Sequence, residues 1–425
     1  MSRSPKSQKM GFSATWAMAV GGMVGGGIFS VLGVVIEMAG AWAWLSFVLA
    51  GIIALTTGHS YVALATKFEE GGGAFTYLRE IDHEGMAGSL SWVLIIGYVL
   101  TISVYAFTFG HYLAAVIGSA AWISRVAAVT IVVVLIGVNL LGVGEASWLE
   151  IITVWGKLVV LLGLAAIGLW HFHPEAIHYA NADPGGLGGA LLGAASIFMA
   201  YEGFQLLSYD YADIRSPDET LRRATIWAII AVIVVYVVVA LGAVSLVGAA
   251  KMLEHKEIAL ASAGQQALGM TGKVLVSIAA AFSTASAINA TLFSSARLTA
   301  KVADDGELPG WFQARNSHQI PARAVVSIGV IGATLAVVGG LGQLVEAASL
   351  AFLFAFASVN VIAARQTDSW RWVSWTGAVL AIVAAVALII RLAINEPISL
   401  AVLGALVVFS TGGRALILRL LHTQP

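Results

Sequence analysis

The amino-acid sequence predicts an all-α membrane protein that crosses the bilayer many times. Of its 425 residues, 59% are hydrophobic and only 11% are charged, whereas soluble domains carry about 25% charged residues. Apolar runs of about 20 residues, the length that spans a bilayer as a helix, recur along the chain. The net charge of −1 excludes the basic excess that marks nucleic-acid binding. The lipid bilayer is therefore an expected partner and nucleic acid is not.

Twelve membrane spans follow from this pattern. They are expected near residues 13–35, 40–66, 88–117, 122–141, 149–170, 188–211, 224–249, 272–302, 324–340, 342–364, 370–391 and 396–418. No stretch between the spans is long enough for a second domain. We therefore expect residues 1–425 to form a single transmembrane domain.

The distribution of basic residues predicts the orientation of the chain. With the N-terminus inside, cytoplasmic segments hold 16 of the 22 Lys and Arg residues, and five lie in outside segments. The remaining one, Lys157, lies within a span. Because cytoplasmic loops collect Lys and Arg, we expect both termini in the cytoplasm and the chain in the plasma membrane.

Two spans carry interruptions in corresponding places, five spans apart. The first contains "VGGMVGGGIF" at residues 20–29, and the sixth contains "AYEGFQ" at residues 200–205. Paired interruptions of this kind indicate a transporter built from two inverted repeats. The repeats would cover about residues 13–170 and 188–364, with two further helices over about 370–418.

Broken helices at membrane depth offer free backbone groups to a ligand. The amides of Gly25, Gly26 and Gly27 could bind a carboxylate, and the carbonyls around Met23 and Met199 could bind an ammonium group. A carboxylate and an ammonium close together describe a zwitterionic amino acid. The alternative interpretation is that the glycines allow close helix packing, as in GxxxG interfaces.

Three stretches resemble a known family. "GGMVGGGIF", "AYEGFQLLSYDYADIRSPDETLRRA" and "FSTASAINATLFSSARLTAKVADDGELP" are similar to the first, sixth and eighth spans of the amino acid, polyamine and organocation (APC) superfamily. The resemblance covers about residues 10–365, and the third stretch is especially like archaeal-type proton-coupled amino acid transporters of broad specificity. It implies the LeuT-type fold, with a 5+5 inverted repeat and broken helices 1 and 6.

The resemblance also implies how the substrate binds: the amides of Gly26 and Gly27 take its carboxylate, and carbonyls of spans 1 and 6 take its amino group. The expected substrate-binding residues are Met23, Gly25, Gly26, Gly27, Met199, Tyr201, Glu202 and Gly203. Many relatives carry an acidic residue where this chain has Gln205, so a pH-sensing role does not carry over. The Glu202 side chain is left with two interpretations, a direct electrostatic role or a packing or gating role against a neighbouring helix. From these assignments we expect Gly27→Val to abolish binding and leave stability nearly intact.

Lys157 is a lone basic residue within the fifth span. A charge inside the membrane is costly and indicates function, although a lysine near a span end can also extend to the interface. In sodium-coupled LeuT-type proteins a sodium ion bridges spans 1 and 8, and proton-coupled relatives place a lysine ammonium there. Lys157 matches that lysine, with the carbonyl of Gly21 and the hydroxyl of Ser283, or else of Thr284 or Ser286, as expected contacts. Some amino acid exchangers carry this lysine as well.

The leading interpretation is a secondary active transporter that moves amino acids by alternating access, sodium-independent and proton-coupled. A polyamine or organocation transporter, suggested by Glu202, and an amino acid exchanger are the alternatives. No enzyme motif such as HExxH, GxSxG or GxxxxGK[ST] occurs, so we expect no enzymatic activity.

We expect no cofactor and no metal site. His171, His173 and His178 cluster in one loop, and we interpret that loop as a solvated outside segment. Nothing in the sequence assigns an oligomeric state.

Overall fold

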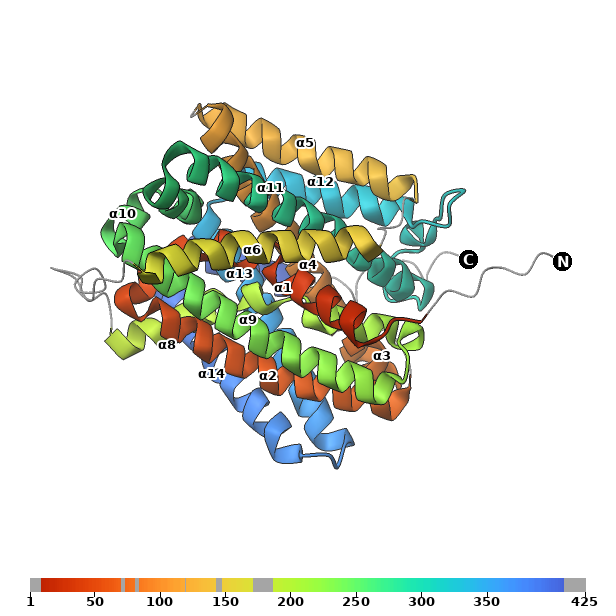
Figure 1. Ribbon diagram of the computed structural model, residues 1–425. Helices are drawn as coiled ribbons and strands as arrows, with labels where there is room; N and C mark the ends of the chain where they lie inside the picture. The colour runs from red at the N-terminus through yellow and green to blue at the C-terminus, as the bar shows by residue number, and fades with distance from the viewer. Residues whose placement is uncertain are drawn as a thin grey trace.

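The computed structural model describes residues 9–69, 73–80, 84–118, 120–142, 147–170 and 186–408 (Figure 1). Regular structure within these ranges is helical, apart from one isolated backbone bridge between Met10 and Ile214. The elements are α1 (Phe12–Ala39), η1 (Gly40–Trp42), α2 (Ala43–Phe68), α3 (Gly73–Glu80), α4 (Glu84–Ile117), α5 (Ala121–Leu140), α6 (Ser147–Trp170), α8 (Gly186–Ser196), η2 (Phe198–Tyr201), η3 (Phe204–Asp213), α9 (Pro217–Val247), α10 (Ala249–Glu254), η4 (Lys256–Ile258), α11 (Ala259–Asp304), η5 (Gly310–Gln313), α12 (Ala322–Val338), α13 (Leu341–Gln366), α14 (Arg371–Asn395) and α15 (Pro397–Val408).

The helices confirm a multi-pass membrane protein. Within the described ranges, nine helices are long and apolar enough to cross a bilayer, and the bent pair of α8 with η2 and η3 makes a tenth. α12 is apolar but has 17 residues, and α15 is described over 12 residues. Each of the twelve predicted spans overlaps a described helix, while the count of twelve remains a prediction.

α1 lies in the interior of the bundle and α5 and α14 lie at its edges (Figure 1). In the most apolar window of α1, 89% of the residues are buried, compared with 22% in α5 and 28% in α14. A helix that is apolar on all sides belongs in a core or in lipid. The burial values place α1 in the core and leave α5 and α14 facing lipid.

Several helical segments extend outside the predicted spans, among them α3, α10 and the first part of α11. α3 buries Phe75 and Tyr77 against the bundle, and α10 follows α9 after a turn at Gly248. α11 begins at Ala259, before the predicted span, and bends at Gly269, whose φ is +61°. Short segments of this kind carry too few apolar residues for a span-length pattern to predict them.

The start of the chain pairs with the end of the sixth span. The amide of Met10 donates to the carbonyl of Asp213 at 2.8 Å, and the amide of Arg215 donates to the carbonyl of Met10 at 2.9 Å. These two bonds join the residues before α1 to the residues after η3. The entrance of the first span and the exit of the sixth are therefore attached.

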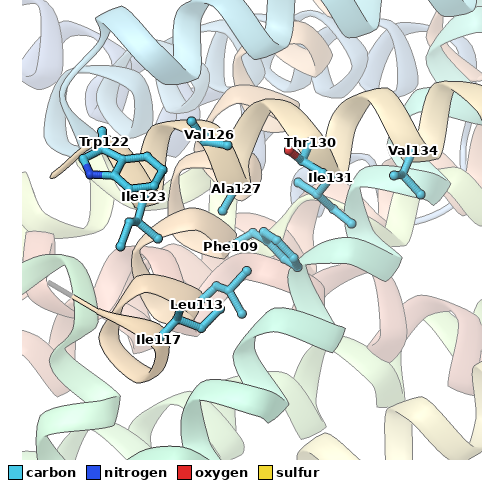
Figure 2. A pocket seen from close by; sticks show the side chains of 10 residues that line it. All are labelled: Phe109, Leu113, Ile117, Trp122, Ile123, Val126, Ala127, Thr130, Ile131 and Val134. Atoms are coloured by element: carbon cyan, nitrogen blue, oxygen red, sulfur yellow. The ribbon is translucent and has the colours of Figure 1, made fainter. Parts of the chain in front are cut away.

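An apolar groove lies between α4 and α5 on the outside of the bundle (Figure 2). Phe109, Leu113 and Ile117 of α4 line it, and α5 contributes the other side with residues from Trp122 to Val134. Apolar side chains exposed on a membrane helix are expected to face lipid tails. The groove is thus distinct from the broken span described next.

Candidate functional site

The candidate site lies where α1 crosses the broken span made of α8, η2 and η3. Gly22 of α1 faces Gly203, the residue just before η3: a Cβ on Gly203 would lie 2.7 Å from the carbonyl carbon of Gly22. The φ of Gly203 is +132°, a conformation that other residues rarely adopt. Glycine is required at 203 for both reasons, and the two backbones touch there.

The sixth span breaks as the sequence predicts. α8 and the following 3-10 segments are bent by 56°, which leaves backbone groups without helical partners. Ser349 of α13 satisfies two of them: its hydroxyl donates to the carbonyl of Ser196 at 2.6 Å and accepts from the amide of Met199 at 3.0 Å. The break is therefore built into the packing of the bundle.

A tyrosine of α9 joins the two crossing segments. The Tyr236 hydroxyl lies 2.6 Å from the carbonyl oxygen of Met23 and 2.9 Å from that of Ala200. The carbonyl of Met199 accepts the amide of Glu202 at 3.0 Å. Since a carbonyl oxygen accepts two hydrogen bonds, Met199 keeps capacity for a ligand, whereas Met23 already accepts the Tyr236 hydroxyl and, within the helix, the amide four residues later.

The break predicted in the first span is wrong for this conformation. α1 is a continuous helix from Phe12 to Ala39, so Gly25, Gly26 and Gly27 lie inside it. Amides within an α-helix bond to carbonyls four residues earlier and do not face a ligand. The sequence pattern misleads because glycine runs accompany both unwinding and close packing, and here close packing prevails.

The neighbours of the glycines show this packing. A Cβ on Gly25 would lie 2.8 Å from the Cβ of Ala287, and one on Gly26 would overlap the ring of Tyr105. A Cβ on Gly27 would lie 2.8 Å from the carbonyl oxygen of Ala200. The expectation that Gly27→Val leaves stability intact is therefore corrected, because a valine there would push α1 away from the sixth span.

Lys157 of α6 reaches the first span. Its side chain is 4% exposed, and its ammonium donates to the carbonyl of Gly21 at 2.9 Å. Ser283 of α11 donates to the carbonyl of Val24 at 3.2 Å and is also hydrogen-bonded to the carbonyl of Gly25. Side chains from α6 and α11 thus bond to successive carbonyls on one stretch of α1.

Glu202 lies at the break with a carboxyl group that is almost completely buried. The residue is 2% exposed, and its Oε1 accepts a hydrogen bond from Nε2 of Gln205 at 2.8 Å. Gln205 in turn accepts from the amide of Gly203 at 2.8 Å and lies 3.5 Å from the Tyr98 hydroxyl of α4. The carboxyl is therefore held within the sixth span, with the amide of Gln205 between it and α4.

The structure brings most of the predicted residues to this crossing. Gly21 to Gly27 lie on α1, and Met199, Tyr201, Glu202 and Gly203 lie at the break, where the Tyr201 hydroxyl donates to the carbonyl of Phe47 at 2.7 Å. Sequence reasoning missed Tyr105, Tyr236 and Ser349. A single tyrosine inside the apolar run "AVIVVYVVVA" is the one signal that could have indicated Tyr236.

No set of three His, Asp or Glu side chains that could hold a metal ion occurs in the described ranges. His171, His173 and His178 lie outside those ranges. The site described above therefore rests on backbone carbonyls, hydroxyls, one ammonium and one carboxyl.

A bundle of apolar helices with a broken span and ionisable groups at its centre defines a membrane transport protein rather than an enzyme. A family model described as amino acid permease matches residues 10–409, nearly the whole chain. The chain belongs to this family. It is a multi-pass protein of the plasma membrane.

Individual relatives agree with this assignment. An uncharacterized protein of Methanocaldococcus jannaschii is 30% identical over 311 residues, covering 72% of this chain and 71% of the relative. The inner membrane transport protein YbaT of Escherichia coli is 28% identical, covering 82% and 81%. The serine/threonine exchanger SteT of Bacillus subtilis is 25% identical, covering 74% and 72%.

Proposed function

We propose that this protein is a secondary active transporter that carries amino acids across the plasma membrane by alternating access. The substrate site lies where α1 crosses the break of the sixth span, in a LeuT-type arrangement of two inverted repeats with both termini in the cytoplasm. The family supports an amino acid as the substrate. The bend of 56° beside a buried first span supports the position of the site.

Binding of the substrate carboxylate requires a second conformation of α1. In the present conformation Gly25, Gly26 and Gly27 lie inside a continuous helix. Glycine gives up helical structure at the lowest cost after proline, so this stretch is the part of α1 best suited to open. The carbonyls of Met23, Met199 and Glu202 then hold the amino group of the substrate.

The proposal about coupling rests on the position of Lys157. A buried ammonium bonded to the Gly21 carbonyl at 2.9 Å places a positive charge beside α1, where a sodium-coupled protein would use an ion. Burial disfavours the charged form and the carbonyl favours it, so a change in hydration during the cycle shifts the balance. We therefore propose sodium-independent transport coupled to protons through Lys157. The carbonyl of Gly21 is its partner in this conformation, and the hydroxyl of Ser283 is proposed as a second contact during the cycle.

Two alternatives rest on specific observations. When ionised, the buried carboxyl of Glu202 would supply the negative charge that binds a polyamine or another organocation. The name of SteT describes an exchanger, and exchange of one amino acid for another needs no net proton flux. Inhibition of amino acid uptake by putrescine favours the first alternative, and uptake that requires internal amino acid favours the second.

The test is uptake of a panel of radiolabelled amino acids into proteoliposomes, with sodium and pH varied independently. We expect uptake without sodium that rises as external pH falls, and a loss of this pH response in Lys157→Ala. Lys251→Ala is the matched control, because Lys251 is exposed on α10. A sodium requirement in the unmodified protein, or an unchanged pH response in Lys157→Ala, would show that the coupling proposal is wrong.

A further inference from the structure

One face of α4 runs along the break of the sixth span. Tyr98, Thr101 and Tyr105 are spaced by three and four residues, which places them on the same side of the helix. Tyr98 lies 3.5 Å from Gln205 of the broken span, and the ring of Tyr105 occupies the space that a Cβ on Gly26 would need. Thr101 lies between them and therefore points to the same region.

Two hydroxyls on this face have no hydrogen-bond partner. Thr101 is 0% exposed and Tyr105 is 1% exposed, and neither Thr101 Oγ1 nor Tyr105 Oη is bonded to any group of the described ranges. Buried hydroxyls are almost always hydrogen-bonded, and each exception needs an explanation. Two unpaired hydroxyls lie on a helix face whose Tyr105 ring packs against Gly26 of α1, and a ligand bound at the crossing would supply the missing partner.

The Glu202 carboxyl adds a third acceptor to the same region. Gln205 supplies one hydrogen bond to it, while a carboxylate has capacity for about four. Five tyrosines of the described ranges interact with it electrostatically: Tyr61 of α2, Tyr98 and Tyr105 of α4, Tyr209 of η3 and Tyr236 of α9. The surroundings of Glu202 are thus rich in neutral hydroxyls, and its remaining lone pairs suit a donor supplied by the substrate.

We propose that Thr101, Tyr105 and Glu202 form a pocket for the substrate side chain, and that this pocket selects amino acids whose side chain donates a hydrogen bond. Hydroxyl, amide and ammonium side chains share this chemistry. An apolar side chain of the same shape leaves the Thr101 and Tyr105 hydroxyls buried without a partner, and a site built to hydrogen-bond its substrate rejects an analogue that lacks the bonding group. The inference rests on the proposed function and specifies its substrates.

Ligand pairs of matched shape test the proposal. Threonine against valine, asparagine against leucine, and lysine against norleucine compare the same skeleton with and without a donor. Binding is measured by competition with a radiolabelled amino acid on the purified protein. In at least one pair, we expect the amino acid with the donor to bind at least about tenfold more tightly than its apolar counterpart. This ratio of affinities should fall toward one in Thr101→Val, Tyr105→Phe and Glu202→Leu. The Thr101 and Tyr105 variants test the pocket even if Glu202→Leu does not fold.

Thr108→Val is the control on the same helix. Thr108 is also fully buried, but its hydroxyl lies 2.8 Å from that of Ser30 and is already paired. We expect Thr108→Val to keep the donor preference and to lower the unfolding temperature of the ligand-free protein. Thr101→Val should leave that temperature unchanged or raise it, because it removes a hydroxyl without a partner.

The outcomes separate this inference from the proposed function. Equal binding of donor and apolar members in all three pairs overturns the pocket and leaves an amino acid transporter. A fall in unfolding temperature for Thr101→Val equal to that for Thr108→Val also overturns it. Failure of every amino acid to bind overturns the proposed function instead. A preference confined to lysine over norleucine supports the pocket with Glu202 ionised.

Discussion

Gly27 on α1 offers a quantitative test of how tightly the first and sixth spans are packed. A Cβ at this position would lie 2.8 Å from the carbonyl oxygen of Ala200, whereas ordinary contacts begin at 3.4 Å. Gly27→Ala therefore requires α1 and η2 to separate by about 0.6 Å. The Tyr236 hydroxyl, which bonds to the carbonyls of Met23 and Ala200, has to move as well.

The expected cost follows from three terms. Overpacking a close contact costs about 1–3 kcal/mol, and weakening the Tyr236 hydrogen bonds costs about 0.5–1.5 kcal/mol. Alanine regains about 1 kcal/mol because it favours the helix more than glycine does. Gly27→Ala should therefore reduce the free energy of unfolding by about 0.5–3.5 kcal/mol.

Thermal unfolding of the purified protein in detergent is the assay, with Gly163→Ala as the matched control. Gly163 also lies inside a helix, α6, but a Cβ there would have no neighbour within 4 Å. We expect Gly27→Ala to unfold at a lower temperature than the unmodified protein, and Gly163→Ala at the same temperature or a higher one. Equal unfolding temperatures for the two variants would refute the packing argument.

Two further variants test polar contacts by the same assay. Arg391→Ala leaves the nearly buried carboxyl of Glu346 without its partner at 3.0 Å and should lower the free energy of unfolding by about 3 kcal/mol. Lys256→Ala removes a more exposed ion pair and should lower it by at most about 1 kcal/mol. Equal losses of stability in the two variants would contradict the role of burial. Asn360→Ala removes the acceptor 2.6 Å from the buried Ser60 hydroxyl and should lower the free energy of unfolding by about 1–3 kcal/mol. An unchanged unfolding temperature would show that this contact contributes nothing to stability.

The sequence predicted the features that depend on local pattern. Apolar runs predicted the long helices, because a span needs about 20 such residues. The break of the sixth span was also predictable, since "AYEGFQ" combines an ionisable residue with Gly203, and Gly203 does adopt a positive φ. Lys157 was recognisable because a lysine inside a span is rare.

Features that depend on which helices meet were not predictable from one sequence. Glycines in "VGGMVGGGIF" are compatible with unwinding and with close packing, and the choice depends on Tyr105, Ala200 and Ala287, which are distant in the chain. The partners of the broken span, Ser349 and Tyr236, are likewise 150 and 36 residues from the groups they bond. Hydrophobic patterning contains no information about such pairs.

The backbone pairing between Met10 and the end of η3 has a mechanical consequence. Its two hydrogen bonds attach the residues before the first span to the residues after the sixth. At the crossing itself, Gly22 and Gly203 hold the same two segments at backbone contact. Two points of attachment restrict pivoting of one segment about the other, so any rocking motion should carry the first part of α1, up to Gly22, together with η3 as one rigid unit.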